Sequence, residues 1–411
     1  MKRTSLIAAL AAALTVGTVA ALVPPALADK TAPATAAKPD KDMQTVLDAL
    51  AALNGKPIET LTPAEARLQP TPTDAVKAVI AAKTKKPAAP EPVGNVADQT
   101  YPSAAGDKLP LRIYTPKDAK KGAILPVIVY FHGGGWVIAN LDVYDSAPRS
   151  LANQTGAIVV SAEYHLAPEK KFPAAHDDAF AAYTWVRANA ASFGGDPERI
   201  AVAGESAGAN LAINVALKAR DTKQGTIAHM LLVYPVAGKD MTTPSYVANA
   251  DAKPLNKPMM QWFVKNTFAT PDGANDPRID LVDRTDLAGL PPTTLVTAEI
   301  DPLMSEGQAL GKKLVAAGVK VDELAVKGVT LSSPAWAPSA RRRSPRSPPR
   351  RRTSRPRSQR PPRRSAPSRL GGCAAASSCW SCSPRAGASA SRSTPRSTRR
   401  SSPMRPSTPR R

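Results

Sequence analysis

The sequence predicts an α/β fold, with a mostly parallel central sheet flanked by helices. From about residue 91, segments with a strand pattern alternate with segments with a helix pattern, which is the order found in parallel sheets. The run LPVIVYF (125–131) is apolar on both faces, as expected for a central strand covered by helices on both sides. Two glycine-rich motifs directly follow predicted strands, at the edge where such sheets bind ligands.

The individual elements are predicted from the period of the apolar residues and from the Gly and Pro residues that flank them. Short apolar or alternating runs indicate strands, whereas apolar residues repeated every three to four positions indicate helices. Strands are expected at 94–101, 109–115, 125–131, 157–163, 199–204, 229–234, 293–299 and 321–326, and helices at 142–154, 175–191, 207–220 and 304–317.

Residues 236–290 interrupt this alternation. They carry several prolines around a short aromatic helix near Trp262. A long Pro-rich stretch within an α/β domain of residues 91–330 is typical of a cap inserted over a pocket. The prolines are Pro244, Pro254, Pro258, Pro271 and Pro277.

The sequence of residues 29–90 predicts a linker followed by an N-terminal helical cap segment. Residues 29–42 lack periodicity and predict a flexible linker. Residues 43–83 look helical, with a helix-start signature at TPAE (62–65), and we expect these helices to cover part of the active site. One apolar stripe consists of Met43, Val46, Leu47, Leu50 and Leu53, with Gly55 ending the helix, and a later one of Val76, Val79 and Ile80.

Residues 1–28 have the composition of a secretory signal peptide. Lys2 and Arg3 precede an apolar stretch, and ALA (26–28) offers small residues at a cleavage site. An uncleaved membrane anchor is the alternative, but the prolines at 24–25 end the stretch early. The sequence therefore predicts a secreted or periplasmic protein with no membrane span after signal removal.

The formal net charge of +22 is concentrated at the C-terminal end. Residues 331–411 hold 21 Arg and no Lys, Asp or Glu, which leaves 34 basic and 33 acidic residues in 1–330. All three Cys also lie in this segment, without a nearby His, so a zinc site is not expected. Because a segment of Arg, Ser and Pro buries too little apolar surface to fold, we expect 331–411 to be a disordered tail.

The motif GESAG (204–208) follows a predicted strand and precedes an apolar helix. Glycines at both flanks allow the chain to turn sharply and to expose Ser206 at the sheet edge. The helix that begins there adds backbone N–H groups and a positive dipole end beside the hydroxyl. Ser206 is therefore the candidate nucleophile, and an ordinary strand–helix turn is the alternative.

The motif HGGGW (132–136) directly follows the predicted central strand. Glycines let backbone amides face a carbonyl oxygen without hindrance from side chains. Gly133, Gly134 and Ala207 are therefore predicted to donate their N–H groups to an oxyanion. His132 is expected to order this loop rather than to act as a base.

With these motifs the sequence resembles the hormone-sensitive-lipase-like branch of α/β-hydrolase fold esterases. The resemblance covers about 91–330. It implies hydrolysis of small carboxylic esters with short acyl chains by a Ser–Asp–His triad, without a metal and without a cofactor. The matching segments are HGGGW (132–136), YHLAPEKKFPAAHDD (164–178), GGDPERIAVAGESAGANLA (194–212) and EIDPL (299–303).

By this resemblance the triad acid falls on Asp301, which follows the predicted strand 293–299. Capping of the next helix is the alternative role for Asp301, and Glu299 is the alternative acid. The family has its base in Gly-x-Thr-His, where this chain reads GVTL (328–331). No histidine occupies the base position, because the four in the chain are His132, His165, His176 and His229.

The composition changes abruptly at the residue where the histidine belongs, and we hypothesise a reading-frame shift near Thr330. A GC-rich gene read out of frame yields a product rich in Arg, Ser and Pro. The codons of Ala335-Trp336, GCN-TGG, are compatible with this, because an adjacent frame contains NTG-GGN. An intact frame in the sequenced transcript would remove the hypothesis.

Three functions stay open at this point: an esterase impaired by the missing base, a binding module without turnover, and a nucleic-acid binder that uses the Arg-rich segment 331–411. A secretion signal argues against the third, so no specific nucleic-acid partner is expected. The sequence makes no prediction of the oligomeric state, and it does not identify a group that replaces the missing histidine.

Overall fold

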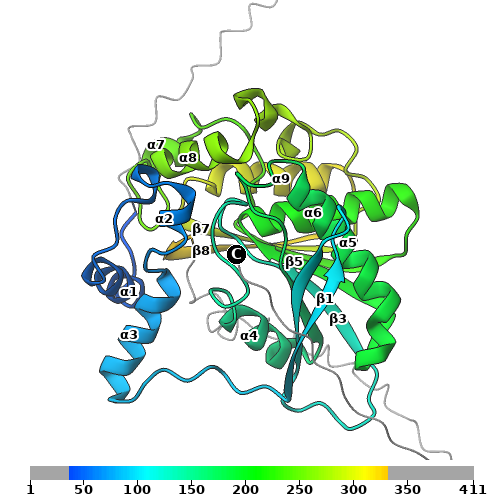
Figure 1. The fold of residues 1–411 in the computed structure, drawn as a ribbon. Coiled ribbons are helices and arrows are strands. Elements are labelled where there is room, and N and C mark those ends of the chain that lie inside the picture. Colours follow the sequence, from blue (N-terminus) through cyan, green and yellow to red (C-terminus); the bar gives the residue numbers. More distant parts are fainter. Residues whose placement is uncertain (1–36, 332–411) are drawn as a thin grey trace, which may run out of the picture. The chain divides into compact units, whose positions relative to one another are not determined.

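Eight strands form one sheet within residues 37–331, the part of the chain that this computed structural model describes (Figure 1). In sheet order they are β1 (Asn95–Pro102), β2 (Lys108–Thr115), β4 (Ile158–Ala162), β3 (Leu125–Phe131), β5 (Gly195–Glu205), β6 (Ile227–Val233), β7 (Thr293–Ile300) and β8 (Val321–Thr330). β2 pairs antiparallel with β1 and β4, and all other neighbours are parallel. The predicted mostly parallel sheet is confirmed.

β3 lies in the interior of the sheet and is buried on both faces. Val127, Val129 and Phe131 belong to the larger hydrophobic core, whereas Ile128 and Tyr130 belong to the smaller one. Because side chains of a strand alternate between faces, these two cores lie on opposite sides of the sheet. This arrangement explains why residues 125–131 are apolar without alternation.

Helices cover both faces of the sheet, as predicted. They are α4 (Ser146–Thr155), α5 (Ala174–Asn189), α6 (Ala207–Thr222) and α9 (Met304–Ala316). α4 contributes Leu151 to the smaller core, and α6 contributes Leu211 to the larger one. Leu310 of α9 is fully buried and joins the larger core as well.

The N-terminal segment forms short helices beside the sheet (Figure 1). They are α1 (Lys41–Ala52), η1 (Ile58–Thr60), α2 (Pro63–Ala66) and α3 (Pro72–Thr84). The predicted start at Thr62 is a capping box, in which Thr62 Oγ1 accepts from the Glu65 N–H and the Glu65 carboxylate accepts from the Thr62 N–H. α1 ends at Ala52, shortly before the predicted Gly55, and Asn54 rather than Gly55 takes the left-handed conformation, with φ 54°.

The cap segment contains α7 (Pro244–Ala248) and α8 (Lys257–Thr267), the latter being the predicted aromatic helix. Trp262 Nε1 of α8 donates to Leu61 O at 2.9 Å, and Asn256 Nδ2 donates to Glu59 Oε1 at 3.1 Å. The cap and the N-terminal helices are thus hydrogen-bonded to each other. The division into segments 29–90, 91–330 and 236–290 stays a prediction.

Several predicted segments lie outside the described residues: the signal peptide 1–28, most of the linker 29–42, and all but the first residue of the tail 331–411. That first residue, Leu331, packs in the larger core with 7% of its surface exposed. Between residues 37 and 331, no helix is long and apolar enough to cross a membrane.

Candidate active site

Ser206 occupies a sharp turn between β5 and α6. Its backbone has φ 55° and ψ −118°, a conformation that costs a non-glycine residue about 1–3 kcal/mol. The Ser206 N–H donates to Val233 O at 2.9 Å, and this bond ties the turn to β6. A Cβ at Gly204 would lie 2.2 Å from Gly208 O, and one at Gly208 would lie 2.1 Å from Phe131 O. Both glycines of the motif are therefore sterically required.

Gly133 lies directly against the Ser206 turn. A Cβ placed on Gly133 would be 3.4 Å from Ser206 Cβ and 3.0 Å from Glu205 O. Gly134 has φ 104°, and a Cβ there would come within 2.2 Å of Ile138 O. The loop after β3 that carries HGGGW is called the glycine loop (residues 132–141). Its predicted proximity to Ser206 is thus present in the structure.

Three backbone N–H groups at this junction have no acceptor among residues 37–331. Those of Gly133 and Gly134 make no hydrogen bond within this range. Ala207 is the first residue of α6, and the first N–H groups of a helix have no acceptor within the helix. These donors and the positive end of the α6 dipole favour negative charge beside Ser206.

Asp301 directly follows β7 and is completely buried. Its Oδ1 accepts from the Leu303 N–H at 2.9 Å, but Oδ2 has no partner among the described residues. Burial raises the pKa of Asp301 to about 7. The hydrogen bond to Leu303 precedes α9, which has no side-chain cap hydrogen bond, so the alternative role of Asp301 as a helix cap is not seen in the structure.

Leu331 lies at the position next to Asp301. In the parallel pairing of β7 with β8, Ile300 is the partner of Thr330, so Asp301 and Leu331 leave the sheet at the same edge. Leu331 also lines the cavity that contains Ser206. The residue that follows β8 beside Asp301 is therefore apolar, and it shares a cavity with the candidate nucleophile.

No described residue accepts a hydrogen bond from Ser206 Oγ, and each histidine has a partner elsewhere. Burial also lowers the pKa of His176 to about 4, so this imidazole is neutral at pH 7. The ring nitrogens lie 3.0 Å from Glu163 for His132, 2.7 Å from Asp178 for His165, 2.8 Å from Asn210 for His176 and 3.0 Å from Thr294 for His229. Residues 37–331 likewise contain no cluster of His, Cys, Asp or Glu suited to a metal ion.

Sequence reasoning did not identify two further carboxylates beside the site. Glu205 is buried and accepts hydrogen bonds from the hydroxyl groups of Tyr130 and Tyr234, and burial raises its pKa. Glu163 pairs with His132 and also accepts from the Leu141 N–H at 3.1 Å, which fixes both ends of the glycine loop. The position of Glu205 within GESAG was the only local signal for either residue.

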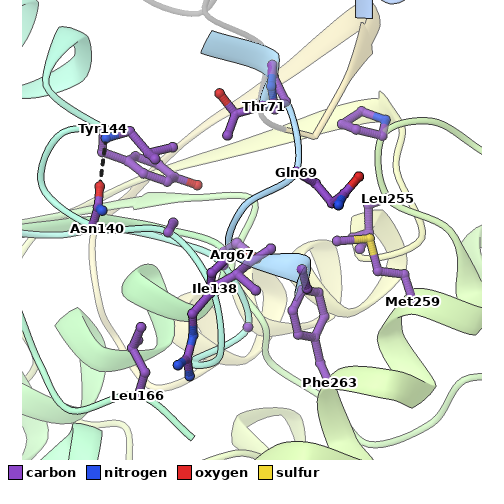
Figure 2. A pocket seen from close by; sticks show the side chains of 18 of the residues that line it. Arg67, Gln69, Thr71, Ile138, Asn140, Tyr144, Leu166, Leu255, Met259 and Phe263 are labelled. Atoms are coloured by element: carbon purple, nitrogen blue, oxygen red, sulfur yellow. Dashed lines mark hydrogen bonds between the residues drawn. The ribbon is translucent and has the colours of Figure 1, made fainter. Parts of the chain in front are cut away.

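Two cavities meet at Ser206. The large cavity has a volume of about 280 Å³ and is lined by the N-terminal segment, the glycine loop and α8. Arg67, Gln69 and Thr71 lie between Tyr144 on one side and Met259 on the other in the view of Figure 2. The predicted cover over the site by the N-terminal helices is therefore present.

The small cavity has a volume of about 30 Å³ and lies toward α8 and Val236. Ser206, Gly135 and Phe263 line both cavities. A Cβ at Gly135 would come within 2.2 Å of the Phe263 ring, so these two residues form the partition.

Comparison with known proteins agrees with this geometry. A family model described as "alpha/beta hydrolase fold" matches residues 128–332, a range that contains Gly133, Ser206 and Asp301. The chain is 42% identical over 229 residues to the carboxylesterase NlhH of Mycobacterium tuberculosis, covering 52% of this chain and 67% of that relative.

Two further comparisons cover more of the chain. The ethyl acetate hydrolase of Pseudomonas putida is 30% identical over 275 residues, which are 67% of this chain and 84% of that relative. The solved structure of an esterase from Pyrobaculum calidifontis matches with a TM-score of 0.62 at 34% identity, covering 71% of this chain and 90% of that chain.

Proposed function

The chain belongs to the α/β-hydrolase fold family and is an ester hydrolase by family, and from this premise we propose that it acts on short-chain acyl esters through a serine acyl-enzyme, with turnover impaired by a missing base. The proposal rests on one observation. Ser206 is held on a strained turn against Gly133, beside N–H groups that lack an acceptor within residues 37–331.

In the proposed reaction, Ser206 Oγ attacks the carbonyl carbon of the ester. The carbonyl oxygen becomes an oxyanion that accepts hydrogen bonds from the N–H groups of Gly133, Gly134 and Ala207. The bond to the alcohol oxygen breaks, and the proton from Ser206 ends on the departing alcohol. Water then attacks the acyl-enzyme, which releases the carboxylic acid and regenerates the serine.

A base must carry that proton in each half of the reaction, and Asp301 would orient it. Leu331 cannot accept a proton, so Ser206 stays a neutral alcohol that is a weak nucleophile. Loss of a triad member costs on the order of a million-fold in turnover, while about 10³–10⁴-fold over water survives from the oxyanion donors and binding. We therefore propose low but Ser206-dependent hydrolysis by this chain.

Replacement of Leu331 by histidine tests the proposal. In the Leu331→His variant, an imidazole would lie between Asp301 and Ser206, and a positioned general base contributes typically about 10²–10⁴-fold. We expect kcat for 4-nitrophenyl acetate to rise at least about 100-fold, within that range. The measurement is steady-state hydrolysis followed by nitrophenolate absorbance.

Two controls accompany this measurement. Leu331→Asn introduces a polar group of similar size that is not a base, and it should leave the rate low. Ser206→Ala in the Leu331→His background should abolish the gained activity. If the gain persists without Ser206, or if Leu331→His gives none, the serine mechanism with this base position is wrong.

A binding module without turnover is the second candidate function. It is favoured by Leu331, which completes an apolar wall of the large cavity where a base would otherwise lie. In that case a short-chain ester should bind to the wild-type chain and remain intact. Ser206-dependent product formation by the wild-type chain would argue against this candidate.

Secretion or export to the periplasm is also part of the proposal, on the composition of residues 1–28 alone. The mature protein should then begin at Asp29. N-terminal sequencing of protein recovered outside the cytoplasm checks this, and an N-terminus at Met1 would contradict it.

A further inference from the structure

We propose that the site takes strongly asymmetric esters, with an acyl group of two or three carbons and an elongated, mainly apolar alcohol that extends beneath the N-terminal helix α1. This inference rests on the proposed function, because it assigns the two sides of the ester around Ser206. It adds a distal binding site for the alcohol that lies outside the catalytic groups.

The position of the catalytic base determines which of the two cavities holds the alcohol part of the ester. In serine acyl transfer, the base gives its proton to the leaving group, so the alcohol must depart on the side where the base lies. That position is held here by Leu331, which follows β8 next to Asp301. Leu331 lines the large cavity and is absent from the lining of the small one. The alcohol therefore occupies the large cavity.

The acyl group must then occupy the small cavity. Its volume of about 30 Å³ accommodates roughly two groups the size of a water molecule. The contact between Gly135 and the Phe263 ring closes it toward the large cavity. A longer acyl chain would have to displace this ring, which is buried in the core. The small cavity therefore limits the acyl group to acetyl or propionyl.

A third cavity of about 510 Å³, the distal cavity, lies beside the large one. Both are lined by Gln69 and Thr71 of the N-terminal segment, by Ile138 of the glycine loop and by Pro254 and Met259 of the cap. These shared residues place the two cavities side by side, and in the proposed complex the alcohol chain passes between these side chains from the large cavity into the distal one. The site thus offers far more room on the alcohol side than on the acyl side.

One part of the distal cavity wall is apolar and offers a surface for an alkyl chain. α1 contributes Leu47 and Leu50, and Pro57 and Ile58 follow from the next turn. Four charged side chains also border it. Three of them are exposed at the surface, and Glu59 accepts a hydrogen bond from Asn256 at 3.1 Å; the exposed ones are Asp48, Lys56 and Lys253. An alcohol with an alkyl chain of about eight carbons would bury its methylene groups there, each of which favours transfer from water.

Two isomeric esters test this assignment in the Leu331→His variant. Octyl acetate and ethyl octanoate have the same formula and nearly equal hydrophobicity, but opposite asymmetry. We expect kcat/KM for octyl acetate to exceed that for ethyl octanoate at least ten-fold. The Leu50→Asp substitution places a carboxylate in the distal cavity, and it should reduce this preference to about three-fold or less.

A binding measurement on the wild-type chain does not require turnover. Octan-1-ol should displace a fluorescent apolar dye, and Leu50→Asp should weaken its apparent affinity at least five-fold. Val315→Asp is the matched control, because Val315 lies exposed on α9 and lines none of the three cavities. It should change neither the preference nor the affinity.

The outcomes separate this inference from the proposed function. Equal rates, or a preference for ethyl octanoate, would overturn the assignment while leaving the serine hydrolase intact. Absence of any Ser206-dependent hydrolysis would overturn the proposed function. The octan-1-ol measurement tests the distal site independently of turnover. Weaker binding to Leu50→Asp but not to Val315→Asp supports the distal site, whereas equal binding to the wild type and both variants overturns it.

Discussion

Asp301 and Leu331 follow the neighbouring strands β7 and β8, and the apolar side chain of Leu331 cannot form a hydrogen bond with the Asp301 carboxylate. A carboxylate that is completely buried normally has partners for both oxygens, because an unpaired buried charge is costly. Oδ2 of Asp301 has none among residues 37–331, and burial raises its pKa to about 7. The residue that follows β8 beside it is apolar. At the residue scale, the site contains an acid whose structural partner is missing.

This arrangement makes stability depend on pH through Asp301. Its folded-state pKa of about 7 lies above the unfolded value of about 3.9, so the folded state holds the proton more tightly. The stabilisation is therefore complete below about pH 4 and is lost as the pH rises through about 7. Asp301→Asn cannot ionise and should remove this decline, which amounts to as much as about 4 kcal/mol.

Urea denaturation between pH 4 and pH 8 measures the effect. The free energy of unfolding of the wild type should fall over this range, and that of Asp301→Asn should fall by less. Glu306 is also buried with a raised pKa, so part of the decline should remain. Asp322→Asn, at an exposed position of β8, is the control. Parallel pH profiles for wild type and Asp301→Asn would show that Asp301 is ionised in the folded protein.

At the scale of elements, Arg67 connects the N-terminal helices to the glycine loop. Its guanidinium donates from Nε to Val137 O and from Nη2 to Ala167 O, both at 2.8 Å, and also pairs with both oxygens of Glu169. Val137 in turn donates to Gly134 O at 3.0 Å. Arg67 thus links the cover of the large cavity to the loop that carries the candidate oxyanion donors.

Arg67→Met should therefore affect stability and catalysis together. It leaves two carbonyl groups without their donor, and we expect a loss of about 2 kcal/mol in the free energy of unfolding. In the Leu331→His background we also expect kcat to fall several-fold, because the oxyanion donors become less fixed. Thermal unfolding and ester hydrolysis provide the two measurements.

Lys77→Met is the control, because the ion pair of Lys77 with Asp74 is exposed and lies within α3. Its effects should be small on both measurements. If Arg67→Met lowers stability but leaves kcat unchanged, Arg67 only anchors the cover and does not order the glycine loop.

At the scale of the whole molecule, local sequence patterns predicted the sheet and the groups around Ser206, but not the contacts that join distant segments. Apolar runs located all eight strands, and the GESAG and HGGGW motifs brought Ser206 and Gly133 together in one place. Arg67, by contrast, contacts residues 70 and 100 positions away. Such pairs arise from tertiary packing and leave no periodic signal near either residue. The partners of Glu205, on β3 and after β6, were hidden for the same reason.

The distribution of charge over the whole chain gives the last prediction. The 21 arginines of residues 331–411 account for nearly all of the net charge of +22, so the segment 1–330 is electrostatically balanced. Attraction to phosphate groups should therefore depend on the Arg-rich segment alone and lack sequence specificity.

We expect the full chain to bind duplex DNA with a dissociation constant of roughly 10⁻⁴–10⁻⁶ M at physiological salt, the range of non-specific binding. Affinity should fall steeply between about 50 and 200 mM salt, because each neutralised phosphate releases counterions. Fluorescence anisotropy with two unrelated duplexes measures both properties. A chain that ends at Leu331 should lose DNA binding and retain octan-1-ol binding, because the cavities are built from residues before 332. DNA binding that survives this truncation, or that distinguishes the two duplexes, would mean that the balanced body of the protein contains a nucleic-acid site of its own.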